Sequence, residues 1–303
     1  MSIEPATPPR SILSQIFLSP NEPRLRAGWR LLIQTLLLLA FGIVVSLGSL
    51  VIANLLNTSL DNFMLSEIAE FIVVTGSVFL ARVWLDKRSI ASLGLEFNRW
   101  ILWDILAGIL ITFIVMGFIF LAMSALGWIT FQAFSWQNEP IFGVITNVLV
   151  FLIIFIFVGW NEELLSRGYH LQTLESGLNL TWGVILSSTV FGLLHLGNPN
   201  ATWVSAAGIF FAGLFLAYGY IRTKQLWLSI GLHIGWNLFE GVVFGFPVSG
   251  LNIYPLMQIQ VHGPELWTGG AFGPEAGLIV LPGLLIGAIL IYVYTSWLRR
   301  ESE

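Results

Sequence analysis

The sequence predicts an all-α protein that crosses a membrane about eight times. Of its 303 residues only 10% are charged and 56% are hydrophobic, and the hydrophobic residues come in long blocks. A soluble domain has roughly a quarter of its residues charged. Blocks of about 20 apolar residues match the length that a helix needs to cross about 30 Å of hydrocarbon. Lipid is therefore expected to surround most of the chain.

The expected spans follow from the apolar blocks in order along the chain. They are 30–56, 63–85, 101–126, 142–160, 182–197, 203–221, 226–245 and 276–298. The first block is longer than the core of a signal peptide and lacks a clear small-residue cleavage site, so we expect it to remain in the protein.

We divide the chain into four parts. Residues 1–29 contain five prolines and are expected to form a flexible cytoplasmic leader. Residues 30–141 hold the first three helices, and residues 142–246 form a core of helices four to seven. Residues 247–303 comprise a glycine- and proline-rich outer loop and the eighth helix.

The distribution of basic residues predicts the orientation of these helices. With the N-terminus inside, all 13 lysines and arginines lie within or beside the inner segments, and none lies in an outer loop. The inner segments are then 1–29, 86–100, 161–181, 222–225 and 299–303. Because lysine and arginine favour the cytoplasmic side, we expect both termini in the cytoplasm and the protein in the cell membrane if the organism is prokaryotic.

Composition excludes several kinds of chemistry. The chain has no cysteine, so disulfides, thiolate nucleophiles and thiolate-bound metals are ruled out, and only four histidines are available for catalysis or metal binding. No basic patch predicts a nucleic-acid partner. The expected partners are membrane lipid and whatever the polar residues inside the spans recognise.

A charged group at the end of the fourth span is the first candidate site. Charges inside hydrophobic stretches are costly, so each is a functional candidate. On a continued helix, Glu163 and Arg167 are four residues apart and can pair, whereas Glu162 is rotated by about 100° from its neighbour and is the freer carboxylate. The competing interpretation is a solvated helix end with an ordinary salt bridge.

Two further spans carry isolated polar residues. His195 follows Phe191 by four residues in an apolar span, where a packed histidine bonded to a carbonyl is the common alternative. His233 and Asn237 are also four residues apart, so they share one helix face and can converge on one small atom. Hydrogen bonding between membrane helices would explain the second pair equally well.

Taken in order, these residues resemble a known family. Glu162-Glu163-x-x-x-Arg167, Phe191-x-x-x-His195 and His233-x-x-x-Asn237 resemble the three motifs of the CAAX prenyl protease type II and bacteriocin-processing (CPBP, or Abi) intramembrane proteases. Each motif is weak alone and the ordered set is specific. The resemblance covers about residues 142–246.

The resemblance implies a role for each matching residue. Glu162 with His195 would activate a water, while His233 and Asn237 would stabilise the oxyanion formed on the scissile carbonyl. Glu163 and Arg167 would be a supporting pair, although the arginine can instead meet a substrate carboxylate. Phe191 would also be supporting.

The resemblance leaves metal dependence open. Glu162, His195 and His233 can form a zinc site with two histidines and one carboxylate, and the family is often described as metalloproteases. Nothing resembling His-Glu-x-x-His is present. A metal-free mechanism gives Asn237 a natural role, so we expect that no cofactor is required and keep zinc as the alternative.

The expected activity is hydrolysis of a peptide bond in a peptide or in a prenylated or otherwise lipid-linked protein. A non-catalytic membrane scaffold or a bacteriocin self-immunity protein is the main alternative, and a transporter is third because the polar residues gather in one half of the chain. One geometric problem accompanies this prediction. Glu162 is expected near the inner end of the fourth span and His195 near the outer end of the fifth, unless the fourth is longer or the fifth is short and kinked.

Overall fold

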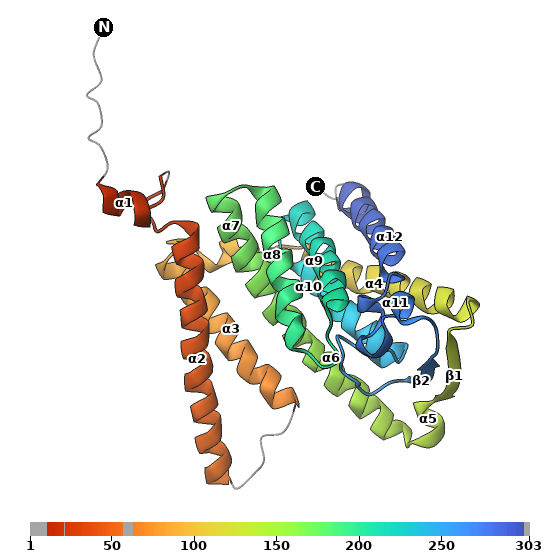
Figure 1. The fold of residues 1–303 in the computed structure, drawn as a ribbon. Helices are drawn as coiled ribbons and strands as arrows, with labels where there is room; N and C mark the ends of the chain where they lie inside the picture. The colour runs from red at the N-terminus through yellow and green to blue at the C-terminus, as the bar shows by residue number, and fades with distance from the viewer. Residues whose placement is uncertain (1–10, 21, 57–62, 300–303) are drawn as a thin grey trace.

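The structure, a computed structural model, describes residues 11–20, 22–56 and 63–299. Within these residues, seven helical stretches are long and apolar enough to cross a membrane (Figure 1). They are formed by α2 (Ala27–Leu56), α3 (Phe63–Trp84), α4 (Ile101–Ala125), the continuous α6 (Ile141–Glu163), η2 (Leu164–Leu171) and α7 (Gln172–Gly177), α8 (Leu180–Leu194) with η3 (His195–Gly197), α9 (Trp203–Thr223), and α12 (Val280–Val293) with η7 (Tyr294–Leu298). The predicted class, an all-α polytopic membrane protein, is confirmed.

The helix predicted at 226–245 differs from the other seven. It consists of α10 (Trp227–Asn237) and its π-helical continuation η4 (Leu238–Val243), and it is shorter than the stretches counted above. Every residue of α10 from Leu228 to Asn237 is buried. This helix is therefore enclosed by its neighbours, which explains why apolar residues surround its few polar ones, Ser229, His233 and Asn237.

Glycines allow α10 to pack with its backbone against α4. A Cβ on Gly231 would lie 2.3 Å from the carbonyl oxygen of Ile105, and a Cβ on Gly235 would lie 2.2 Å from the Thr112 hydroxyl. Small residues four apart are typical of close contacts between membrane helices. A larger residue at either position would force the two helices apart.

Two short strands join loops that are far apart in the sequence. β1 (Ile129–Phe134) follows α4, and β2 (Met257–Val261) precedes α12; they pair antiparallel, with Ile129 opposite Val261. The short helices α5 (Ser135–Asn138) and α11 (Glu265–Thr268) and the 3₁₀ turns η5 (Gly270–Phe272) and η6 (Pro274–Ala276) belong to the same two connections. Both connections were predicted to be outer loops, and their pairing places them at one end of the bundle (Figure 1).

The segments predicted to be inner also contact one another. Asp86 pairs with Arg30 and, at 3.0 Å, with Arg82. The Gln225 side chain donates to the Glu96 carboxylate at 3.0 Å, which ties the connection after α9 to the one that holds η1 (Ile90–Leu93). The helix ends are thus grouped as the charge pattern predicts, while the side of the membrane on which each group lies remains a prediction.

Part of the predicted flexible leader is folded. Residues 12–17 form α1, and Leu18 bridges to Leu25. Arg24 is 5% exposed and lies 3.6 Å from Asp86, so a buried ion pair holds this segment on the bundle. Residues 1–10 and 21 of the leader lie outside the described residues.

The core and the lipid-facing surface are both apolar. The largest buried cluster lies between α4, α9, α10 and α12 and includes Val115, Leu216 and Leu232. On α2, large side chains such as Leu36 and Leu39 are more than half exposed. Apolar side chains on the outer face are expected where lipid tails replace water.

Candidate active site

The helix that carries Glu162 is longer than predicted, and Glu162 lies at the same depth in the bundle as His195. The sequence placed the end of the fourth span at residue 160, followed by an inner loop, and this boundary is wrong. The helix that starts at Ile141 continues to Gly177 through the π-helical turns of η2. Glu162 therefore lies inside a 37-residue helix instead of at its end, level with His195 at the end of α8. π-Helical turns are frequent at functional sites.

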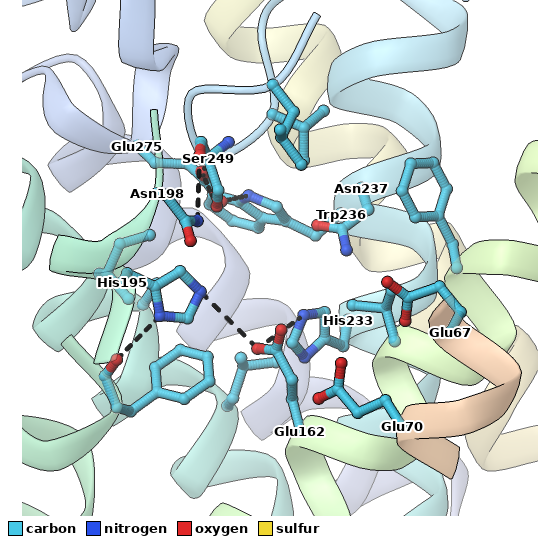
Figure 2. Close-up of a pocket in the computed structure, with 18 of the residues that line it drawn as sticks. Glu67, Glu70, Glu162, His195, Asn198, His233, Trp236, Asn237, Ser249 and Glu275 are labelled. Atoms are coloured by element: carbon cyan, nitrogen blue, oxygen red, sulfur yellow. Dashed lines mark hydrogen bonds and ion pairs between the residues drawn. The ribbon is translucent and has the colours of Figure 1, made fainter. Parts of the chain in front are cut away.

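Glu162 faces two histidines. Its Oε2 lies 3.8 Å from Nε2 of His195 and 3.7 Å from Nε2 of His233 (Figure 2). The Glu162 side chain is 28% exposed, yet this oxygen is buried and makes no hydrogen bond to a described residue. The three groups thus border one small space, and a water there can contact all three because these gaps are shorter than two consecutive hydrogen bonds.

The other ring nitrogen of each histidine is already engaged. Nδ1 of His195 lies 2.8 Å from the Phe191 carbonyl oxygen, and Nδ1 of His233 lies 2.8 Å from Oε1 of Glu163. A carbonyl and a carboxylate oxygen only accept, so both Nδ1 atoms carry the proton and donate. In the neutral rings each Nε2 is then an unprotonated base directed at Glu162.

Glu163 and Arg167 form the pair that their spacing predicts. Arg167 Nη1 donates to Oε1 of Glu163 at 2.7 Å, and both side chains are almost completely buried. Arg167 also donates to the Gly213 carbonyl of α9 at 2.9 Å, and its guanidinium lies 4.4 Å from the centre of the Phe191 ring. One buried network therefore joins the helices that carry His195 and His233, and Glu163 orients His233 from behind.

A cavity of about 220 Å³ lies in front of Glu162. His195, His233 and Asn237 line it together with residues of α3, α9 and the 246–275 connection. Asn237 is one turn beyond His233 on α10, and Figure 2 shows its amide at the cavity wall. All four residues predicted to carry out catalysis border the same cavity, while Glu163 and Arg167 lie behind it.

Two acidic cavity residues that the sequence analysis did not predict lie in the second span. Glu67 and Glu70 lie on α3, three residues apart, and line the same cavity as Glu162. Figure 2 shows both carboxylates directed into it. Two acids inside an apolar block are a signal of the same kind as Glu162 and Glu163, so the sequence did contain the information.

Two more wall residues, Glu275 and Ser249, had no readable signal in the sequence. Glu275, which was expected in an outer loop, is buried; it accepts from the Trp236 indole at 2.9 Å and from the Ser249 hydroxyl at 2.7 Å. Burial raises the pKa of the Glu275 carboxyl above its usual range, although these hydrogen bonds act in the opposite direction. Only the folding of the 246–275 connection back into the bundle places Glu275 and Ser249 beside the cavity.

The predicted zinc ligands have suitable chemistry but not a ready geometry. Two unprotonated histidine nitrogens and a carboxylate are ordinary zinc donors. Among the residues that the structure describes, however, no three such side chains are arranged to hold a metal ion.

Residues 144–239 match the family model described as type II CAAX prenyl endopeptidase Rce1-like. This segment is similar to the CPBP family. The matched segment runs from α6 into η4 and contains the three motifs that border or support the cavity. The resemblance seen in the sequence is confirmed.

One curated relative supports the same assignment. The chain is 29% identical over 128 residues to the Bacillus subtilis (strain 168) protein named "Putative membrane peptidase YdiL". The match covers 42% of this chain and 50% of that protein, so the chain spans about half the length of the curated relative it matches. No solved structure matches the chain.

Proposed function

We propose that the chain is an intramembrane endopeptidase that hydrolyses a peptide bond in a membrane-associated or lipid-linked substrate. The observation that carries this proposal is the meeting of Glu162 Oε2 with two histidine Nε2 atoms, 3.7 and 3.8 Å away, at the wall of a cavity among membrane helices. The CPBP match and the membrane peptidase relative support protease activity at the level of the family.

In the proposed reaction Glu162 and His195 activate a water that lies between them. Glu162 accepts a proton as the water oxygen attacks the carbonyl carbon of the scissile bond. The hydrogen bond from Nδ1 of His195 to the Phe191 carbonyl holds the ring so that its Nε2 faces the water. When the tetrahedral intermediate collapses, the carbon–nitrogen bond breaks and the leaving amine takes up the proton.

His233 and Asn237 are proposed to stabilise the oxyanion. The Asn237 amide donates directly, and His233 donates from Nε2 when both ring nitrogens are protonated. Glu163, which accepts from the His233 Nδ1 at 2.8 Å, favours that positively charged form. Donors fixed before the reaction act mainly on the transition state, because the negative charge on the oxygen develops only there.

The proposed mechanism is metal-free. A protein purified with a chelator should keep its turnover, and added zinc should not raise it. Loss of turnover on chelation, with recovery when zinc is restored, would favour a metal held by Glu162, His195 and His233.

A scaffold or immunity role explains only part of the geometry. Glu163, Arg167 and His233 do form a buried network between helices, as a scaffold would require. Glu162 and Asn237 instead face a cavity, and the buried Glu162 oxygen lacks any hydrogen bond to a described residue. A scaffold does not require polar groups that face a cavity, so this arrangement favours catalysis.

The decisive experiment compares the parent protein with Glu162→Gln in detergent. Both are incubated with a prenylated peptide and a panel of bacteriocin leader peptides, and the products are identified by mass spectrometry. Glutamine keeps the volume of the side chain but cannot accept the proton, so cleavage should occur with the parent and fall by about a hundredfold or more in the variant. Equal cleavage by both well-folded proteins would favour the scaffold.

A further inference from the structure

The cavity in front of Glu162 is acidic. Glu67 and Glu70 approach from α3, Glu162 from α6, and Glu275 from the connection before α12. Figure 2 shows the first three carboxylates directed toward the same space. Glu162 lies close enough to Glu67 and Glu70 to act on both of them electrostatically.

No lysine or arginine of the described residues neutralises this cavity, and its two histidines face Glu162. Neither lysine nor arginine is among the residues that line it. Arg167 is the nearest cation to Glu162 in the sequence, but it is 1% exposed and bonded to Glu163 and to the Gly213 carbonyl. It is therefore not available to a substrate carboxylate.

Glu67 gives the strongest indication that these acids pair with a cationic group of the substrate. Its residue is 8% exposed, it lines the cavity, and it makes no hydrogen bond or ion pair with any described residue. Its carboxylate is directed into the cavity (Figure 2), where a group that enters the cavity can pair with it. A cation in the cavity would supply the missing partner.

A second hollow, next to the cavity, indicates what shape of substrate fits beside Glu162. It shares Glu70, Glu162 and His195 with the cavity and extends between helices past apolar side chains that include Leu38 and Leu194. Its volume is about 410 Å³. An extended peptide can thus pass the catalytic residues with apolar side chains in this hollow and another side chain near Glu67 and Glu70.

We propose that the substrate presents a lysine or arginine side chain to Glu67 and Glu70, within about three residues of the cleaved bond. This inference rests on the proposed peptidase function and specifies its substrate class. Three extended residues reach about 10 Å.

The test uses synthetic peptides that share one apolar segment and differ at a single position. Lysine, glutamine or glutamate is placed in turn at each of the three residues on either side of the cleaved bond. The parent should prefer lysine to glutamine by about tenfold or more at one position, because a charged hydrogen bond is gained there, and should disfavour glutamate. Glu67→Gln and Glu70→Gln should each lower the ratio of lysine-peptide to glutamine-peptide cleavage. Glu70→Lys, at an exposed position, should reverse the preference, so that the glutamine peptide is cleaved faster than the lysine peptide.

Glu265→Gln is the matched control. Glu265 is an exposed acid of α11 that does not line the cavity, so its removal should leave the lysine preference unchanged. Should Glu67→Gln fail to fold, the Glu70 variants carry the test. Cleavage that depends on Glu162 but is indifferent to lysine, glutamine or glutamate at every position would overturn the inference and leave the proposed function intact.

A binding measurement separates the two proposals. Fluorescent lysine and glutamate peptides are titrated against Glu162→Gln protein with and without Glu70→Lys. Tighter binding of the lysine peptide that is lost with Glu70→Lys supports the inference even if the parent cleaves nothing. Equal binding of both peptides would overturn it.

Discussion

Glu162→Gln and His195→Asn, alone and together, test whether these residues act on one water. Glutamine lacks the proton-accepting carboxylate. Asparagine can still donate to the Phe191 carbonyl, as His195 Nδ1 does at 2.8 Å, but it has no counterpart of Nε2. The 3.8 Å between Glu162 Oε2 and His195 Nε2 is shorter than two consecutive hydrogen bonds, so one water can contact both.

The geometry sets the expected magnitude. Each single change should lower turnover by about a hundredfold or more, which is about 2.7 kcal/mol of transition-state stabilisation. Independent residues would give a double variant slower by about ten-thousandfold. If both act on one water, the second change removes nothing further, and the double variant should remain about a hundredfold slower, with a coupling energy of about 2.7 kcal/mol.

The assay is single-turnover cleavage of one peptide by purified proteins in detergent, with size-exclusion profiles and thermal unfolding as folding controls. Additive losses in well-folded variants would show that Glu162 and His195 act on different steps. Near-parental turnover of Glu162→Gln would refute the catalytic assignment altogether and leave the scaffold as the better hypothesis.

Three other predictions follow from particular contacts. Glu163→Gln and Arg167→Gln each leave a buried charge without its partner at 2.7 Å, so each should lower the free energy of unfolding by about 3–5 kcal/mol; unchanged melting temperatures in detergent would contradict the pairing. Asn237→Ala should lower kcat with little change in KM, as steady-state kinetics can measure, whereas a raised KM alone would assign it to substrate binding. Reporter fusions at Gln132 and Phe97 should report the outer and inner sides respectively, and the same side for both would refute the alternating topology.

The sequence was most informative where function requires polar groups inside apolar blocks. Glu162, His195, His233 and Asn237 were identified because charges and amides are rare in membrane spans and because their order matches the CPBP motifs. The structure places all four at one cavity wall. Their catalytic roles remain predictions until variants are measured.

The wrong boundary after residue 160 has a physical origin. Residues 161–181 were interpreted as a loop because their composition is polar, but buried ion pairs and hydrogen bonds allow such residues to continue a helix inside the bundle. Arg167 is satisfied by Glu163 and Gly213, and Gln172 by Leu93 and Arg82. A hydropathy scale reflects the free-energy cost of exposing a polar group to lipid. That cost does not arise when a neighbouring helix supplies a hydrogen-bond or ion-pair partner for the group.

The sequence by itself determined the membrane class, the apolar helices and the motif residues, because helix formation in lipid depends on local hydrophobicity and the motifs are local spacings. Only the tertiary structure decided that Glu162 lies level with His195 and that Glu67 and Glu275 face the same cavity. These arrangements arise from contacts between distant segments, such as the approach of α10 to α4 at Gly231 and Gly235 and the return of the connection that holds Glu275. Local spacing cannot encode which helices meet, because that is set by how their surfaces fit together in three dimensions.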